Sequence, residues 1–368
     1  MYLPEIYFVI SFLYLAATVF LLSGIRRKYS INHYLPSVSV IVAARNEEAN
    51  IEKCLTSLTK QDYHGEMEII IVNDRSEDKT GEISENFIKE HPNFKLVNIT
   101  ETDEELTGKQ YAMQTGIEQS TGDIIISTDA DCEVSYGWVS SMASYFNDDI
   151  GLVAGYSAPP LDSTFSTLQA MDHLFLIGIA SGFAGVGLPQ SCIGNNIAFR
   201  RSVYDDIGGY QGIGRTVTED VGLLKAIANN TSYKVIFNRE IESLVKTRPA
   251  SSLTELTNQR MRWLVGGFDA GSVVIVSLVL TFLEIIFSAG TILLIPFVGV
   301  SGYAILALAM FFGSNLSVML TNKHLIDRDN IIKWFFPHQF FFMVNSLYYG
   351  ILYLTGKRSV NWKGREYN

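Results

Sequence analysis

The chain has 368 residues, of which 48% are hydrophobic, 12% aromatic and only 18% charged, with a mean hydropathy of +0.18. There is too little charge for an ordinary soluble protein and too much apolar content for a disordered chain, so part of the chain is expected to lie in a membrane. The net charge of −10 is uneven, because residues 36–268 hold 18 Lys and Arg against 32 Asp and Glu, giving −14 there and +4 elsewhere. An acidic body argues against nucleic acid as a partner, since phosphate contacts need a concentrated positive surface.

The first predicted element is a membrane anchor at residues 1–28. From Leu3 to Gly24 the chain is apolar apart from Glu5, which is long enough for a spanning helix of about 20 residues. A basic cluster at residues 26–28 follows this stretch, whereas a cleaved signal peptide carries its basic residues before it. We therefore expect an uncleaved anchor with its N-terminus outside and the following residues in the cytoplasm.

Short β-branched runs then alternate with helical stretches, which is typical of βαβ units and an α/β fold with a largely parallel sheet. The helices are expected at residues 48–60 and 109–120. The strands are expected at VSVIVAA (38–44), MEIIIVN (67–73), KLVNIT (95–100), GDIIIST (122–128), GLVAGYS (151–157) and the IAFRR run beginning at Ile197. Runs this apolar should be buried on both faces of the sheet. Because open α/β sheets bind ligands beyond the carboxyl ends of their strands, the residues after each run matter most.

Polar residues follow three of these strands at the point where each strand ends. RNEE (45–48) follows the first strand, Asp74 and Arg75 follow the second, and Asp129 and Asp131 follow the fourth. A single Asp in such a place is most often a turn or helix cap, but three acidic strand ends at one sheet edge favour a binding site. Asp129 and Asp131 have DxD spacing, and Mg²⁺ and Mn²⁺ take such hard oxygen ligands together with a substrate diphosphate.

Other catalytic motifs are missing from the sequence. It contains no GxxxxGK[ST], HExxH or GxSxG, and the glycines of residues 182–188 are not ordered as GxGxxG. Cys54, Cys132 and Cys192 form no CxxC pair, which indicates buried free thiols in a reducing compartment. His173 lies in an apolar stretch, where a packed or hydrogen-bonded histidine is more common than a catalytic one.

Two further segments allow two interpretations each. Residues 164–188 are unusually apolar, with Asp172 and His173 as interruptions. They form either an amphipathic element on the bilayer that helps a lipid acceptor enter, or a core helix under the sheet. Gly194 and the two following residues, Asn195 and Asn196, either contact the acceptor or form a turn before the next strand.

Residues 269–356 are predicted to contain about three membrane helices. Residues 270–320 carry one charge, Glu284, and are long enough for two spans, while residues 334–356 carry none and make a third. Three C-terminal spans after a cytoplasmic domain would place the basic tail at 357–368 outside the cell. The positive charge of this tail favours the inside, so one apolar segment is expected to be interfacial or re-entrant. Glu284 is either a functional intramembrane carboxylate or a residue near a helix end that reaches water.

The ordered motifs VSVIVAARNEE, VNDRS, TGKQYAMQTG, STDADC, GNNIAFRR, TED and QRMRW, with membrane helices on both sides, resemble the family 2 membrane glycosyltransferases of the GT-A fold. The resemblance is close over about residues 36–268 and looser over the membrane layout. Chain length and span count are most similar to the ceramide glucosyltransferase-like branch of lipid glycosyltransferases, and WKGREY (362–367) resembles an ending of bacterial members. The resemblance to this family implies a cytoplasmic GT-A domain with a Rossmann-like sheet over 36–268, in a multi-pass protein of the cell (inner) membrane.

The resemblance also implies roles for individual residues. Asp220 in TED matches the catalytic base, with Glu219 beside it, and Asp129 and Asp131 match the metal-binding DxD. Asp74 is expected to accept a hydrogen bond from a uracil N–H. The positions expected to hold or support the nucleotide-sugar are Ala43, Arg45, Glu47, Asp74, Lys109, Asp129, Gln259, Arg262 and Trp263, of which the last three form a QxxRW motif near the diphosphate and acceptor.

The chemistry of sugar transfer is consistent with these residues. A departing diphosphate develops negative charge, which a divalent metal, Mg²⁺ or Mn²⁺, and a cation such as Arg262 neutralise. The acceptor hydroxyl loses a proton as it attacks the anomeric carbon, and Asp220 is the expected general base. Attack opposite the leaving group inverts that carbon. Trp263 stacks on a sugar or nucleotide, or else anchors the chain at the membrane interface.

The expected function is therefore inverting transfer of a sugar from a nucleotide-sugar, with UDP as the expected nucleotide, to a membrane lipid at the cytoplasmic face. One alternative is a processive polysaccharide synthase, which also carries QxxRW but needs a membrane pore. Another is a non-catalytic scaffold that binds a nucleotide-sugar, which would have no need for Asp220.

Overall fold

The computed structural model describes residues 3–106, 108–268, 271–299, 301–356, 360–362 and 365–367. The chain divides into two compact units. The sheet unit consists of Lys28–Pro160 and Gly187–Pro249, and the helical unit consists of Met1–Arg27, Leu161–Val186 and Ala250–Asn368. Two stretches of the predicted 36–268 domain, residues 161–186 and 250–268, thus group with the membrane segments. Much of the predicted basic tail, including Lys357, Arg358 and Lys363, lies outside the described residues.

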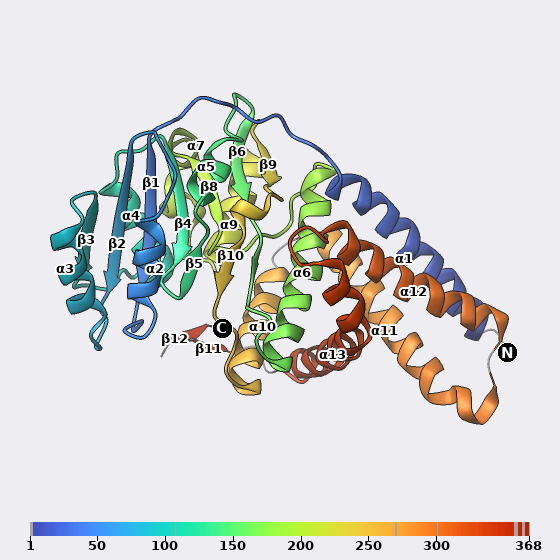
Figure 1. Cartoon of the computed structure of the whole chain (residues 1–368). Helices are drawn as coiled ribbons and strands as arrows, with labels where there is room; N and C mark the ends of the chain where they lie inside the picture. Colours follow the sequence, from blue (N-terminus) through green and yellow to red (C-terminus); the bar gives the residue numbers. More distant parts are fainter. Residues whose placement is uncertain are drawn as a thin grey trace. The chain divides into compact units, whose positions relative to one another are not determined.

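A seven-stranded sheet forms the centre of the sheet unit (Figure 1), in the order β3-β2-β1-β4-β8-β6-β9. Its strands are β1 (Val38–Ala44), β2 (Met67–Asp74), β3 (Phe94–Ile99), β4 (Ile124–Asp129), β6 (Ile150–Ala154), β8 (Ile197–Arg200) and β9 (Lys234–Phe237). β8 runs antiparallel to both of its neighbours, and the other strand pairs of this sheet are parallel. The predicted α/β fold with a mainly parallel sheet is therefore confirmed.

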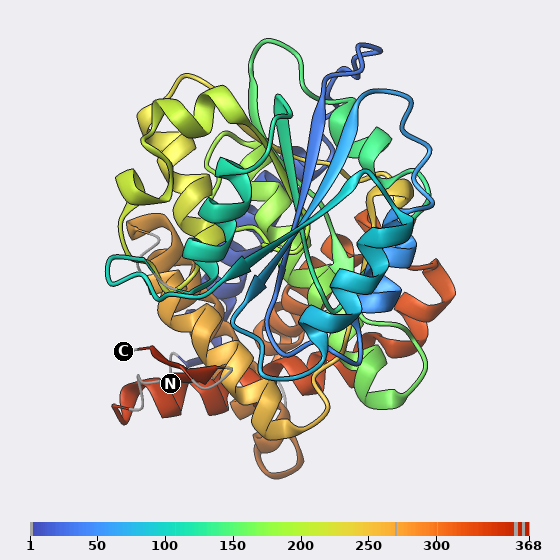
Figure 2. The same cartoon turned by 90° about the vertical axis from the view of Figure 1, so that its left-hand side faces the viewer.

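Helices cover both faces of this sheet (Figure 2). Successive residues of a strand point to opposite sides of the sheet, so strands that are apolar on both sides must be covered on both faces. Val40 and Val42 lie in a buried cluster with Leu55 of α2 (Ile51–Leu58), against which α3 (Thr80–Glu90) also packs. Ile41 faces the other way, towards α4 (Gly108–Glu118). A Cβ on Gly116 of α4 would come within 2.7 Å of Ile41, so this glycine lets α4 approach the sheet closely.

Shorter elements complete the sheet unit. They are α5 (Trp138–Ala143), α7 (Arg201–Asp206), α8 (Gly209–Ile213), α9 (Glu219–Asn230), the 3₁₀ helix η1 (Ile241–Ser243) and a small sheet of β5 (Cys132–Val134), β10 (Val245–Thr247) and β7 (Ser157–Ala158). Sequence inspection missed β9 and the small sheet, because strands of two to four residues are too short to show an apolar period.

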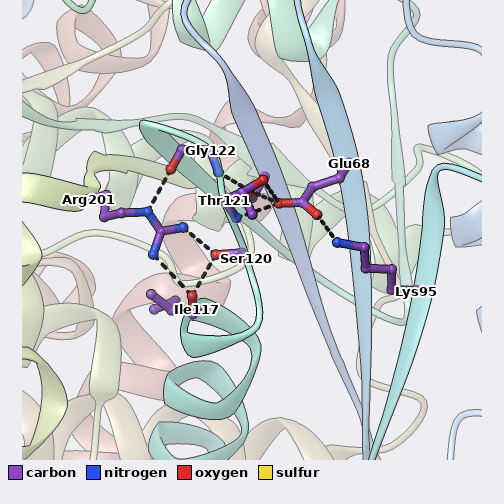
Figure 3. Close-up of polar contacts among 8 residues, drawn as sticks. Glu68, Lys95, Ile117, Ser120, Thr121, Gly122 and Arg201 are labelled. Atoms are coloured by element: carbon purple, nitrogen blue, oxygen red, sulfur yellow. Dashed lines mark hydrogen bonds and ion pairs between the residues drawn. The ribbon is translucent and has the colours of Figure 1, made fainter.

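At the amino ends of its strands, the large sheet is held together by polar contacts (Figure 3). Glu68 of β2 accepts hydrogen bonds from Ser39 of β1 at 2.7 Å, from Thr121 at 2.6 and 2.8 Å, and from Lys95 of β3 at 2.6 Å. Arg201 donates to Ile117 in the last turn of α4 and to Ser120 and Gly122 in the loop between α4 and β4. Burial alone would raise the pKa of Glu68, but its hydrogen bonds outweigh burial and lower the pKa to about 2.

The helical unit contains six helices in the part of the chain that the structure describes. They are α1 (Leu3–Ile25), α6 (Thr164–Gly185), α10 (Leu253–Phe268), α11 (Ser272–Val298), α12 (Gly302–Thr321) and α13 (Arg328–Leu354), followed by a hairpin of β11 (Val360–Trp362) and β12 (Arg365–Tyr367). By length and composition, α1, α11 and α12 are candidate membrane spans among the described residues. The third predicted C-terminal span corresponds to α13, which is helical but is not among these candidates, and polar residues such as His338, Gln339 and Asn345 lie within it.

α6 corresponds to the apolar stretch at residues 164–188, and it matches neither interpretation fully. It packs against α1, α12 and α13 and is buried over most of its length, so an amphipathic helix on a bilayer surface is wrong. It is a core helix, but of the helical unit. A Cβ on Gly185 would lie 2.1 Å from the carbonyl oxygen of Gly24, so glycines let α6 and α1 pack backbone to backbone.

Glu284 lies near the middle of α11 and is completely buried. The interpretation of Glu284 as a residue near a helix end that reaches water is therefore wrong. The predicted burial of free thiols is confirmed for Cys54 and Cys132, whereas Cys192 is free but half-buried.

Candidate active site

The carboxyl ends of three parallel strands meet at one edge of the large sheet. Ala43 of β1 pairs with Val72 of β2 on one side and with Asp129 of β4 on the other. This register brings the polar residues after β1, β2 and β4 to neighbouring positions, as expected from the carboxyl ends of strands in an open, mainly parallel sheet. Ala43 therefore lies between the second and fourth predicted strands.

Asp74 and Arg45, both predicted to hold the nucleotide base, lie together at this edge. Asp74 is 4% exposed, and its Oδ1 atom is 4.0 Å from Nη1 of Arg45. Arg75 also binds Asp74, with its Nε and Nη2 atoms 2.9 and 2.6 Å from Oδ1. Sequence reasoning gave Arg75 no role, although its place beside Asp74 in VNDRS was the available signal.

The loops after β1 and β2 interlock. Asn46 and Arg75 both have a φ of 53°, a left-handed conformation that is uncommon for residues other than glycine. Asn46 accepts a hydrogen bond from the N–H of Glu77 at 2.9 Å. The N–H of Glu47 donates to Thr80 at 2.7 Å, and its buried carboxylate accepts from Asn50 at 2.8 Å. Glu47 is thus placed to support the loop that carries Arg45.

Lys109 of α4 joins the end of β4 to the start of α9. Its Nζ atom lies 2.7 Å from Oδ1 of Asp129 and 2.8 Å from Oε1 of Glu219. Burial lowers the pKa of Lys109, but the two carboxylates outweigh burial and raise it above its ordinary value. Lys109 therefore remains an ammonium group between the DxD and TED motifs.

The two carboxylates of TED differ in their surroundings. Glu219 is buried and paired with Lys109, whereas Asp220 is half-buried, and its Oδ1 atom accepts from the N–H of Val221 at 2.8 Å. A Cβ on Gly194 would lie 3.0 Å from Oε1 of Glu219 and 3.1 Å from Oδ2 of Asp220. Gly194 therefore lies directly against both acids, and a larger residue would crowd them.

Gln110 holds the loop that precedes TED, a role that sequence reasoning missed. Its amide donates to the carbonyl oxygen of Gly214 at 2.8 Å and accepts from the N–H of Thr216 at 3.1 Å. Gly214 has a φ of 75°, which favours glycine at this turn. The only sequence signal was the position of Gln110 beside Lys109.

The two asparagines after Gly194 make different contacts. Asn196 is completely buried, donates to the carbonyl oxygens of Tyr156 and Ser243 at 2.7 and 2.8 Å, and accepts from Trp138 at 2.9 Å. Asn196 is therefore structural. Asn195 is buried and donates to the thiol of Cys132 at 3.4 Å.

The DxD carboxylates can hold a divalent metal only in part. Asp129 and Asp131 supply hard oxygen donors of the type that Mg²⁺ and Mn²⁺ prefer. Among the described residues, no group of three or more His, Cys, Asp or Glu side chains is arranged to hold a metal ion. The donor set fits a cation that takes its other ligands from a diphosphate and water.

The QRMRW motif lies on α10, in the helical unit. Gln259, Arg262 and Trp263 have the i, i+3 and i+4 spacing that places side chains on one helix face. The side-chain oxygen of Gln259 is buried and accepts no hydrogen bond from the described part of the chain. The sheet unit thus brings the other predicted site residues to one edge, while the role of these three stays a prediction.

Two family models match the chain. The model described as Glycosyl transferase family 2 matches residues 39–208, and the one described as Glycosyl transferase family group 2 matches residues 124–353. A beta-monoglucosyldiacylglycerol synthase of Trichormus variabilis is 28% identical over 244 residues, which cover 64% of this chain and 50% of that protein. A poly-beta-1,6-N-acetyl-D-glucosamine synthase of Staphylococcus aureus is 27% identical over 270 residues, 72% of this chain and 63% of that protein.

A solved structure is similar in fold. It is the mannosyltransferase PcManGT from Pyrobaculum calidifontis in complex with GDP-Man and Mn²⁺, with a TM-score of 0.59, 20% identity and coverage of 89% of this chain and 97% of that chain. The chain spans less than two thirds of the length of either curated relative named above. Since the second family model covers more than half of the chain, this protein belongs to the family 2 glycosyltransferases.

Proposed function

We propose that this protein is an inverting glycosyltransferase that moves a sugar from a nucleotide-sugar, with UDP as the expected nucleotide, to a lipid hydroxyl at the cytoplasmic face of the cell membrane. The observation that carries the proposal is the row of acids at one sheet edge, in which Lys109 joins the DxD motif to TED. A binding module would need the nucleotide contacts but not a second carboxylate pair at the start of α9.

The donor is proposed to bind along the ends of β1, β2 and β4. Arg45 and Asp74 contact the base, and the carboxylate of Asp74, which lies beside the guanidinium groups of Arg45 and Arg75, accepts from the uracil N–H. Asp129 and Asp131 would hold Mg²⁺ or Mn²⁺, which supplies positive charge to the diphosphate as it leaves. The QxxRW motif is proposed to lie near the diphosphate and the acceptor. Its residues are Gln259, Arg262 and Trp263.

Asp220 is the proposed general base. A base must be ionised and within reach of the acceptor hydroxyl. Asp220 is more exposed than Glu219, whose carboxylate is engaged by Lys109, and it lies in the first turn of α9, where the helix dipole favours a negative charge. Asp220 takes the hydroxyl proton while the oxygen attacks the anomeric carbon opposite the diphosphate, so that the configuration inverts.

A lipid acceptor is supported by the three candidate membrane spans and by one relative whose name is that of a glucosyldiacylglycerol synthase. The polysaccharide synthase stays an alternative because a poly-beta-1,6-N-acetyl-D-glucosamine synthase matches a larger share of the chain. Mass spectrometry of the product separates the two, since a discrete glycolipid supports the proposal and a long polymer supports the alternative.

The test uses membranes that contain the full chain, a panel of nucleotide-sugars, Mg²⁺ or Mn²⁺ and mixed lipids. Asp220→Asn should lower turnover by about 10²–10⁴-fold while nucleotide binding survives, because the amide cannot accept the proton. Asp206→Asn, an exposed acid of α7, is the matched control and should behave as the wild type. EDTA should also stop transfer. Near-normal turnover of Asp220→Asn would rule out the base, and activity in EDTA would rule out the metal.

A further inference from the structure

The helical unit buries a charged residue of the QRMRW motif that the proposed function does not use. Arg260 is 7% exposed, and its Nη2 atom lies 2.8 Å from Oδ2 of Asp172 in α6. Asp172 is also buried. Two charges removed from water are stable only when they are paired, so this ion pair attaches α10 to α6 at a fixed point.

A series of hydrogen bonds between helices leads from Tyr14 to Asp172. Tyr14 of α1 donates to Asn315 of α12 at 2.8 Å, and Asn315 donates to Gln339 of α13 at 2.7 Å. The amide nitrogen of Gln339 lies 3.2 Å from Nδ1 of His338, and Nε2 of His338 lies 3.4 Å from Oδ1 of Asp172.

The direction of this series follows from its chemistry. An amide nitrogen can only donate, so Nδ1 of His338 accepts, and the ring proton is on Nε2, facing Asp172. Burial raises the pKa of Asp172, but Arg260 and His338 outweigh burial and hold the pKa below its ordinary value. Asp172 is thus an ionised carboxylate that ends the series, with Oδ1 facing Nε2 of His338 and Oδ2 in an ion pair with Arg260.

The same contacts fix the tryptophan of the motif. The guanidinium carbon of Arg260 lies 4.1 Å from the ring centroid of Trp263, a cation–π contact between residues three apart on one helix. The ring of His173 lies 5.5 Å from that of Trp263. Asp172 and His173, the two interruptions of the apolar α6 sequence, therefore hold Arg260 and Trp263 respectively.

We propose that Asp172 is a positioning residue for the QRMRW motif. By holding Arg260, which stacks on Trp263, it keeps the indole in one orientation for sugar transfer. Both carboxylate oxygens of Asp172 are engaged by buried partners, so Asp172 acts through Arg260 and does not contact the substrate. This inference rests on the proposed function, because it requires that Trp263 and Arg262 take part in transfer.

The test separates positioning from stability. Asp172→Asn leaves the Arg260 charge without its partner and should lower the thermal midpoint of the full chain in detergent. The double variant Asp172→Asn/Arg260→Gln removes both charges and should recover that midpoint. Its kcat should still fall by about 10²-fold, since a displaced reactive group costs that much, while the KM for the nucleotide-sugar and the Kd for UDP stay within twofold of the wild type.

Arg260→Lys provides the second readout. Lysine keeps the charge beside Asp172 but lacks the planar group that stacks on Trp263. We expect a wild-type thermal midpoint with a kcat reduced by about tenfold or more. Asp162→Asn, an exposed acid shortly before α6, is the matched control and should change neither quantity.

The outcomes distinguish the two levels of the proposal. A wild-type kcat in both Arg260→Lys and a stable double variant would overturn the positioning role and leave the proposed function intact. If Arg262→Ala and Trp263→Ala also transfer sugar at the wild-type rate, the role of QRMRW itself fails. Absence of any transfer by the wild type would instead contradict the proposed function.

Discussion

At the scale of single residues, the candidate active site depends on one cation between several acids. Lys109 contacts Asp129 and Glu219, and without it these carboxylates would face one another across the end of β4 and the start of α9. Two neighbouring carboxylates without a shared cation repel each other. The position of the DxD strand end relative to TED is therefore set by an electrostatic contact and not by packing alone.

Lys109→Met should test this contact. We expect turnover to fall by about 10–100-fold, which is typical when a partner of a metal-binding group is removed, together with weaker binding of Mn²⁺ in the presence of UDP. Lys60→Met, at an exposed position, is the control. Equal turnover of the two variants in the membrane assay would show that the Lys109 contacts are not needed for transfer.

Glu68 gives a residue-scale prediction about pH. Its pKa of about 2 in the folded chain lies below its ordinary value of 4.5, so its contribution to stability is present above about pH 4.5 and is lost as pH falls towards 2. Glu68→Gln should lower the thermal midpoint by about 2–4 °C at neutral pH. The difference from the wild type should shrink as pH approaches 2, and a constant difference across pH 2–7 would contradict this assignment.

At the scale of elements, strands and helices were predictable to different degrees. The VSVIVAA strand has the predicted bounds because seven apolar or small residues in a row, ended by polar ones, have few other folded states. α6 was predicted to exist, but its surroundings were not, since an apolar helix fits equally under a sheet or among membrane helices. Its glycines carried the missing information, because they meet the backbone of α1.

Gly185→Ala should therefore destabilise the helical unit. Its Cβ would lie 2.1 Å from the carbonyl oxygen of Gly24, so α1 and α6 must separate, at a cost of about 1–3 kcal/mol. Gly313→Ala in α12 is the matched control, because no atom lies within 4 Å of its added Cβ, and alanine favours the helix by up to about 1 kcal/mol. Thermal unfolding in detergent should show a lower midpoint only for Gly185→Ala.

At the scale of the whole molecule, the candidate spans α1, α11 and α12 suggest a membrane topology. An odd number of spans after an outside N-terminus would end inside. The charges agree, since the short segment between α11 and α12 carries no charged residue, whereas Lys323, Arg328 and Lys333 follow α12. If α13 does not cross the membrane, the basic tail would lie on the cytoplasmic side, which is the side that its positive charge favours.

Cysteine labelling in intact cells tests this topology. After the native cysteines are replaced, Ser301→Cys between α11 and α12 should react with an impermeant maleimide. Thr355→Cys at the end of α13 should react only once the membrane is permeabilised. Labelling of Thr355→Cys in intact cells would instead mean that α13 crosses the membrane.

The α/β class, the main parallel strands, three candidate membrane helices and the acids at the strand ends could be predicted from the sequence. These features depend on neighbouring residues, whose apolar period and turn chemistry are local. The folded structure was needed to show that Lys109 joins Asp129 to Glu219, that Asn196 is structural, and that Asp172 binds Arg260. Each of these contacts joins residues far apart in the chain, and their pairing is fixed by burial, since a buried charge or amide must find its partner wherever the fold places it.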